Sequence, residues 1–177
     1  SFRGEDSVIA VAPYDTAALR KAFADADANG WFIEAMFLEP VMGEGDPGRS
    51  VPVEYYNLAR ELTRGHGSLL LVDSIQAGLR ATGYLSIVDY PGFEQAEAPD
   101  METYSKALNA GQFPLSVLAV NERAAGFYRK GIYGNTMTST ARAMDVAITV
   151  LEKLTPDIRK NIVVRGKELV EKLEKLA

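Results

Sequence analysis

Residues 68–73 read Ser-Leu-Leu-Leu-Val-Asp, an apolar run that ends in a carboxylate. A continuous run of this kind is typical of a strand covered on both faces, because no position along it is reserved for contact with water. The sequence therefore predicts a buried strand over residues 68–72, with Asp73 at the end of that strand.

The segments on either side alternate between apolar runs and stretches of helical period. We expect strands over residues 7–12, 31–38, 101–105 and 115–120, and helices over residues 16–29, 52–63, 140–154 and 157–177. Thr16 is expected to cap the first helix, and Asn29 and Gly30 to end it. This alternation favours an α/β fold with a largely parallel sheet.

The composition describes an ordinary globular domain. The chain has 177 residues, of which 47% are hydrophobic and 24% charged, and a chain of this length can bury a sizeable core. The net charge of −5 leaves no strongly basic surface for a nucleic acid. The Lys and Arg residues near the C-terminus alternate with Glu, which indicates a solvated helix face.

The sequence contains no cysteine, which excludes disulfides, thiolate catalysis and cysteine-ligated metals. A single histidine, His66, cannot build a metal site and is interpreted as a turn residue. No apolar run approaches the roughly 20 residues of a membrane span, and the first six residues do not resemble a signal peptide. We therefore expect a cytoplasmic protein with no metal and no membrane anchor.

Asp73 and Lys106 together carry the chemistry that this sequence suggests. A lysine amine can form a Schiff base with the aldehyde of pyridoxal phosphate, and an aspartate can keep the pyridine nitrogen of that cofactor protonated. Neither residue is specific by itself, because a lone lysine usually lies on the surface and an aspartate after a strand often caps a turn or a helix.

Four motifs along the chain make the suggestion specific. Residues 38–45 are LEPVMGEG, residues 71–78 are LVDSIQAG, residues 105–108 are SKAL and residues 134–137 are GNTM. Together they resemble the class-III aminotransferases, which are pyridoxal-phosphate enzymes of fold type I. The resemblance implies a three-layer α/β large domain with a mostly parallel sheet. Residues 1–139 would be its second half, and residues 140–177 would be helices that lead to a small C-terminal domain.

The resemblance also implies roles for single residues. Lys106 matches the Schiff-base lysine, and Asp73 matches the aspartate that pairs with the pyridine nitrogen. Gln76 matches the residue near the ring hydroxyl, and Ile75 the apolar residue that packs on the ring. Thr136 matches a threonine that binds the cofactor phosphate across a dimer interface. Each of these residues also has a plain alternative, as a cap, surface, turn or core residue.

Glu39 and Glu44 match two acidic residues near the substrate and cofactor, and loop solvation is their plain alternative. The chain departs from the family where Ser74 replaces the usual Glu and where residues 138–141 replace a Gly-Gly-Asn-Pro sequence. Family members are also much longer. The resemblance therefore implies that the phosphate-binding loop and most of the small domain lie outside this chain.

The implied function is transfer of an amino group between an amine or amino acid and a 2-oxo acid or aldehyde. Lys106 would act in it as general base and general acid, in a homodimer or in association with the missing parts of the enzyme. A catalytically silent structural or assembly fragment is the main alternative. A pyridoxal-phosphate aminomutase, racemase or decarboxylase with the same lysine and aspartate is a weaker one.

Overall fold

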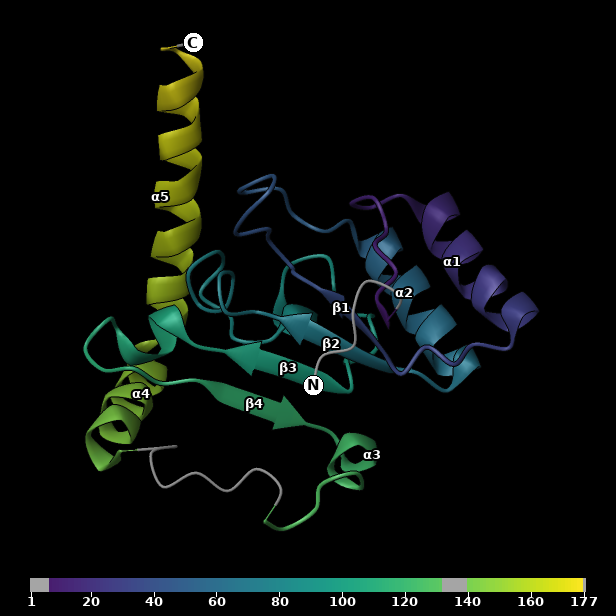
Figure 1. Cartoon of the computed structure of the whole chain (residues 1–177). Coiled ribbons are helices and arrows are strands. Elements are labelled where there is room, and N and C mark those ends of the chain that lie inside the picture. The colour runs from purple at the N-terminus through teal and green to yellow at the C-terminus, as the bar shows by residue number, and fades with distance from the viewer. Residues whose placement is uncertain (1–6, 132–139, 177) are drawn as a thin grey trace.

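A single four-stranded sheet organises the fold (Figure 1). The computed structural model describes residues 7–131 and 140–176. The strands are β1 (Ala35–Leu38), β2 (Leu69–Asp73), β3 (Met101–Tyr104) and β4 (Val117–Val120), and they lie in the order β1-β2-β3-β4. β1, β2 and β3 are parallel, and β4 is antiparallel to β3. This mostly parallel sheet with helices confirms the α/β class.

Two helices form the packed layer on one side of the sheet. α1 (Thr16–Asn29) packs on α2 (Val53–His66), and α2 packs on β1 and β2. The predicted cap of α1 is wrong by one residue. Asp15 is the N-cap, because its extended backbone lets the carboxylate accept a 2.8 Å hydrogen bond from the amide of Ala18. Gly30 ends this helix as predicted, with a φ of 67°.

α2 is longer than the sequence predicted. It continues through residues 64–66, past the expected end at residue 63, and stops at Gly67. Gly65 lies inside the helix, whereas Gly67 adopts the left-handed conformation with a φ of 79°. The helix therefore ends where the backbone turns left-handed, and not at the first glycine.

Two predicted strand segments are absent or shortened. Residues 8–12 form no helix or strand, and Val8 remains 73% exposed. Residues 31–34 are also irregular, with Trp31 and Phe32 exposed, so that strand β1 begins only at residue 35. Apolar character alone does not make a strand, because a strand also needs a hydrogen-bonded neighbour. In the described chain this pairing begins where the amide of Leu69 donates to the carbonyl of Glu34.

The two faces of the sheet are covered unequally. On the α2 side Leu38, Leu70 and Val72 are buried, each at 9% exposure or less. On the opposite side Phe37 and Leu118 are 69% and 53% exposed. Burial along β2 therefore alternates, contrary to the expectation that its strand is covered on both faces.

The C-terminal segment forms two helices. α4 (Ala141–Lys153) begins after the N-cap Thr140 and packs on η3 (Lys106–Asn109), a short 3-10 helix that follows β3. α5 (Pro156–Glu174) has no buried residue and extends away from the sheet as a rod (Figure 1). The division of the chain at residue 139 into two domains stays a prediction.

Two further short elements lie in the described chain. η2 (Ile87–Asp89) lies between β2 and β3, and α3 (Glu122–Ala125) follows β4. Arg159 of α5 contacts the loop before η2, where its Nε donates to the carbonyl of Gly83 at 3.1 Å. Across residues 7–131 and 140–176, no helix is both long and apolar enough to cross a membrane.

A buried ion pair closes the end of the sheet where β2 and β3 begin. Arg60 of α2 donates to Asp100 at 2.7 Å, and the two side chains are 6% and 1% exposed. Asp100 also accepts hydrogen bonds from the amide of Leu70 and from Asn121, both at 2.9 Å. Burial opposes ionisation of Asp100, but these donors outweigh it and hold the pKa of the carboxyl below its usual value.

Candidate active site

Asp73 lies at the opposite end of β2 from this ion pair, on the open face of the sheet. Its Oδ1 accepts a hydrogen bond from the amide of Ile75 at 3.0 Å and another from the hydroxyl of Thr103 at 3.2 Å. Within the part of the chain that the structure describes, no donor is bonded to Oδ2 of Asp73. The carboxylate is thus fixed through one oxygen, and the other can accept a proton-bearing group.

Lys106 follows β3, two residues past the end of that strand. Its φ of 34° lies in the left-handed region, which a residue with a side chain rarely adopts. Such conformations persist where the surrounding structure enforces them, and they gather at functional sites. The exposed side chain donates from Nζ to Oε1 of Gln76.

The loop after β1 reaches the same place. Glu39 accepts a 2.8 Å hydrogen bond from the amide of Gly43. A Cβ at Gly43 would lie 3.3 Å from Oε2 of Glu39 and 3.4 Å from Cγ of Gln76, so this glycine allows the loop to approach the 73–76 turn closely. The structure therefore brings Glu39, Gln76 and Lys106 together from three separate segments.

Of the two remaining predicted site residues, one lies apart from this group and the other is not described. Glu44 is exposed in the loop after β1, and its side chain makes no hydrogen bond or ion pair with any described residue. Thr136 lies outside the described residues. Besides Glu44, the predicted site residues that the structure describes are Asp73, Ile75, Gln76, Lys106 and Glu39.

A buried acidic residue near the site escaped the sequence analysis. Glu102 of β3 is 4% exposed, and it lies among neutral donors. Burial first, and then the nearby Glu102 carboxylate, raises the pKa of Tyr104 and of Tyr90 far above the ordinary value. Both phenols thus stay neutral. The sequence did contain a signal for this residue, namely a charged side chain in the middle of the strand predicted over residues 101–105.

The donor set suits pyridoxal phosphate. An aspartate with one free oxygen fits a protonated pyridine nitrogen, and a lysine held on a turn fits an aldehyde. The close approach at Gly43 leaves backbone, and not a side chain, beside Gln76. The residues present therefore fit the ring and aldehyde of this cofactor.

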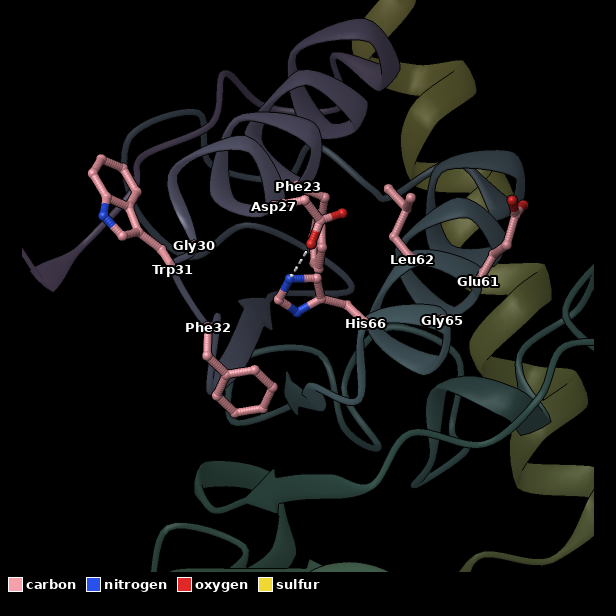
Figure 2. A pocket seen from close by; sticks show the side chains of 9 residues that line it. All are labelled: Phe23, Asp27, Gly30, Trp31, Phe32, Glu61, Leu62, Gly65 and His66. Atoms are coloured by element: carbon pink, nitrogen blue, oxygen red, sulfur yellow. Dashed lines mark ion pairs between the residues drawn. The ribbon is translucent and has the colours of Figure 1, made fainter.

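A separate hollow of about 600 Å³ lies between the C-terminal ends of α1 and α2, away from this site (Figure 2). His66 forms its floor, with Nε2 at 2.9 Å from Asp27 and Nδ1 at 3.0 Å from the Ser68 hydroxyl. The rings of Phe32 and Phe23 pack against the imidazole at centroid distances of 5.6 and 5.4 Å. These contacts join the two helices, and they make His66 a packing residue at the end of α2.

Comparison with known proteins identifies the family. The family model named Aminotransferase class-III matches residues 12–177. The chain therefore belongs to the class-III aminotransferases.

Two relatives of known name are similar to most of this chain. The chain is 35% identical over 163 residues to an ornithine aminotransferase from Emericella nidulans, a match that spans 92% of this chain and 32% of that protein. It is 32% identical over 163 residues to the acetylornithine aminotransferase of Xanthomonas axonopodis pv. citri, again over 92% of this chain and over 37% of that protein. The chain thus spans between about a third and two fifths of the length of these relatives.

Solved structures give the same result. The N-acetylornithine aminotransferase of Stenotrophomonas maltophilia superposes on 99% of this chain and 42% of its own, with a TM-score of 0.76 and 28% identity. An ornithine aminotransferase of Toxoplasma gondii, whose structure has partial occupancy of PLP at the active site, covers 80% of this chain and 31% of its own. Its TM-score is 0.67 and its identity 32%.

Proposed function

We propose that this chain supplies the catalytic lysine and the ring-binding aspartate of a pyridoxal-phosphate-dependent aminotransferase. The enzyme would move an amino group between an amine or amino acid and a 2-oxo acid or aldehyde. The observation that carries the proposal is the meeting of the β2 and β3 ends. It presents Asp73 with a free oxygen and Lys106 in a left-handed conformation beside Gln76.

Each residue has a defined part in this proposal. When bound, pyridoxal phosphate supplies an aldehyde for the amine and an electron-withdrawing ring. Asp73 would hold the proton on the ring nitrogen, and Ile75 would pack against the ring. Lys106 would hold the cofactor through its aldehyde carbon, releasing water as that bond forms. Its Nζ, freed when a substrate amine takes that place, would then move a proton as general base and general acid.

The remaining predicted residues complete the site. Gln76 accepts a hydrogen bond from Nζ of Lys106, which would orient the amine, and it would lie near the ring hydroxyl of the bound cofactor. Thr136 would bind the phosphate, and Glu39 and Glu44 would face the substrate. The relatives named for ornithine and acetylornithine favour an amino acid as the amino donor.

The open face of the sheet supports association with further polypeptide. Phe37, Leu118 and Val120 point to the same side and are 69%, 53% and 46% exposed, and the half-buried Leu71 and Met101 lie between them on that face. We propose that this surface is covered by the remaining parts of the enzyme, and that the whole forms a homodimer. A cytoplasmic location stays a prediction from the sequence.

Reductive trapping tests the proposal directly. The purified protein is incubated with pyridoxal phosphate, reduced with borohydride and weighed intact, and its peptides are then mapped. We expect one stable cofactor adduct on Lys106, and none in a Lys106→Ala variant. Lys160→Ala, which removes an exposed lysine of α5, is the matched control and should keep the adduct.

The same experiment separates the alternatives. A natural polypeptide that carries these residues but takes no adduct would favour the silent structural fragment. An adduct on Lys106 without conversion of an added 2-oxo acid to an amino acid would favour an aminomutase, racemase or decarboxylase.

A further inference from the structure

Glu102 is a buried carboxylate with no cation beside it. The residue lies in the middle of β3, on the α2 side of the sheet, opposite Val72. It is 4% exposed, and among the described residues it has no ion-pair partner. A buried carboxylate is costly unless hydrogen bonds replace its hydration, so the donors around Glu102 define what it does.

Three neutral donors surround this carboxylate. Oε1 accepts from the hydroxyl of Ser74 and, at 3.0 Å, from the amide of Ile87, while Oε2 accepts from the hydroxyl of Ser86 at 2.7 Å. These donors come from the two ends of the connection between β2 and η2, residues 74–87. One side chain of β3 therefore ties both ends of this connection, called here the 74–87 segment, to the sheet.

The 74–87 segment begins beside the candidate active site. Ser74 directly follows Asp73, and its amide donates to the carbonyl of Thr103 at 3.0 Å. The Thr103 hydroxyl in turn donates to Asp73 on the open face of the sheet. Two consecutive residues of β3 thus bind two consecutive residues at the end of β2. Thr103 donates to Asp73 on the open face, and Glu102 accepts from Ser74 on the covered face.

The contact between Glu102 and Ser74 bears on one of the positions where this chain departs from its family. Ser74 stands where the family usually has Glu, so a carboxylate was expected to be missing beside the site. The structure instead has a carboxylate against position 74, supplied by Glu102 from the next strand. The hydroxyl at position 74 has become the donor to it.

We infer that Glu102 is a positioning residue that fixes the 74–87 segment and, through it, Ile75 and Gln76 beside Lys106. The inference rests on the proposed function for the roles of Ile75 and Gln76, but the hydrogen bonds of Glu102 do not depend on it. Removing the acceptors would take from Ser74, Ser86 and the Ile87 amide the carboxylate that they share, and Ser74 and Ile87 are buried. The segment would then lose its side-chain attachment to β3, while the backbone bond from Ser74 to Thr103 and the pairing of the sheet remain.

Two substitutions separate hydrogen bonding from charge. Glu102→Met keeps the length of the side chain but removes both acceptors. Glu102→Gln keeps one acceptor for Ser74 and the Ile87 amide, and its NH₂ group can donate to Ser86, whose hydroxyl can rotate to accept. The Gln variant should therefore behave like the wild type, and the Met variant should not.

The first readout is amide hydrogen exchange of the natural polypeptide that carries this sequence, without added cofactor. In Glu102→Met, amides of residues 75–87 should exchange at least about tenfold faster, while those of α2 change little. Ser86→Ala, a milder change, should loosen only the end of the segment near Ile87. Unchanged exchange over residues 75–87 in Glu102→Met would overturn the inference.

The second readout is the affinity for pyridoxal phosphate, measured by fluorescence titration. Glu102→Met should raise the dissociation constant about tenfold, and Glu102→Gln should restore it. Leu58→Ala, a buried change in α2, is the control for general destabilisation. An equal loss of affinity in Leu58→Ala would overturn a positioning role. If the wild type binds no cofactor, the proposed function fails, while hydrogen exchange still decides whether Glu102 fixes the segment.

Discussion

On one face of the sheet Leu70 and Val72 are fully buried beneath α2, whereas on the other face Phe37 and Leu118 leave more than half of their surface exposed. Phe37 and Leu118 belong to the edge strands β1 and β4, but the same difference is seen within β2, where residues 70 and 72 are buried and residues 69, 71 and 73 are only half-buried. The difference therefore follows the face of the sheet. The covered face is buried within this chain at Leu38, Leu70, Val72 and Glu102, whereas β4 is exposed along its length. The open face carries Asp73 and Thr103, and it is the face that we propose other polypeptide covers.

The polar groups differ in the same way. Asp100, at the covered end of β3, has donors from Arg60, Leu70 and Asn121 on both of its oxygens. Asp73 uses only Oδ1 for hydrogen bonds to the described chain. A carboxylate whose oxygens are all used stabilises a fold, whereas one with a free oxygen can still bind a ligand. This contrast predicts which substitutions change stability and which change activity.

Lys106→Ala gives the largest expected effect, and only on function. Removing the amine should lower transaminase activity by at least about 10³-fold, because Lys106 is the group proposed to bind the aldehyde carbon and move the proton. The free energy of unfolding should change by less than about 1 kcal/mol, since the side chain is exposed. Steady-state kinetics and urea unfolding of the same samples measure both. A variant that keeps its activity would contradict the assignment.

Asp100→Ala should have the opposite profile. It removes the buried partner of Arg60 and leaves that guanidinium only the half-exposed Glu97, at 3.0 Å, which should cost up to about 3–5 kcal/mol of unfolding free energy. Asp46→Ala is the matched control, because Asp46 pairs with Arg49 on the surface, and it should cost less than about 1 kcal/mol. Equal effects of the two variants in urea unfolding would mean that the Arg60–Asp100 pair is not dry.

The two faces can be compared directly with Leu70→Ala and Phe37→Ala. In the 177-residue chain Leu70→Ala should cost about 2–5 kcal/mol, because it leaves a cavity, and Phe37→Ala should cost less than about 0.5 kcal/mol. In the complete polypeptide the cost of Phe37→Ala should rise, if further chain covers that face. If Phe37→Ala lowers the unfolding free energy equally in the 177-residue chain and in the complete polypeptide, nothing covers the open face.

The sequence predicted most of the elements but not the contrast between the two faces. The helices and the inner strands follow from local periodicity, and the roles of Asp73 and Lys106 stay predictions. The strand expected over residues 7–12 and the first half of the strand expected over residues 31–38 are absent, because apolar residues do not specify a hydrogen-bonded neighbour. Glu102 was missed because its donors come from residues 74 and 86–87, and only the folded chain brings them together.

The pH dependence of stability offers a finer test of the covered end. The donors to Asp100 hold its folded pKa below the value of about 3.9 in the unfolded chain. Its contribution is therefore fully present above pH 3.9 and is lost as the pH falls through the folded pKa. The difference in unfolding free energy between wild type and Asp100→Asn should shrink between pH 6 and pH 3. A difference that grows on acidification would have the wrong sign.

The smallest expected effect concerns the backbone of Lys106. Its φ of 34° disfavours any residue with a Cβ, so Lys106→Gly should be more stable than Lys106→Ala by about 1 kcal/mol. Both variants lack the amine, so the comparison isolates the backbone. At Lys153, in the last turn of α4, the order should reverse, because Ala is favoured over Gly in a helix by about 1 kcal/mol. If Ala is also the more stable residue at position 106, the left-handed turn is not enforced. If Gly is the more stable residue at position 106, the left-handed backbone at the native Lys106 lowers the stability of the fold slightly while it presents the amine on the open side of the sheet.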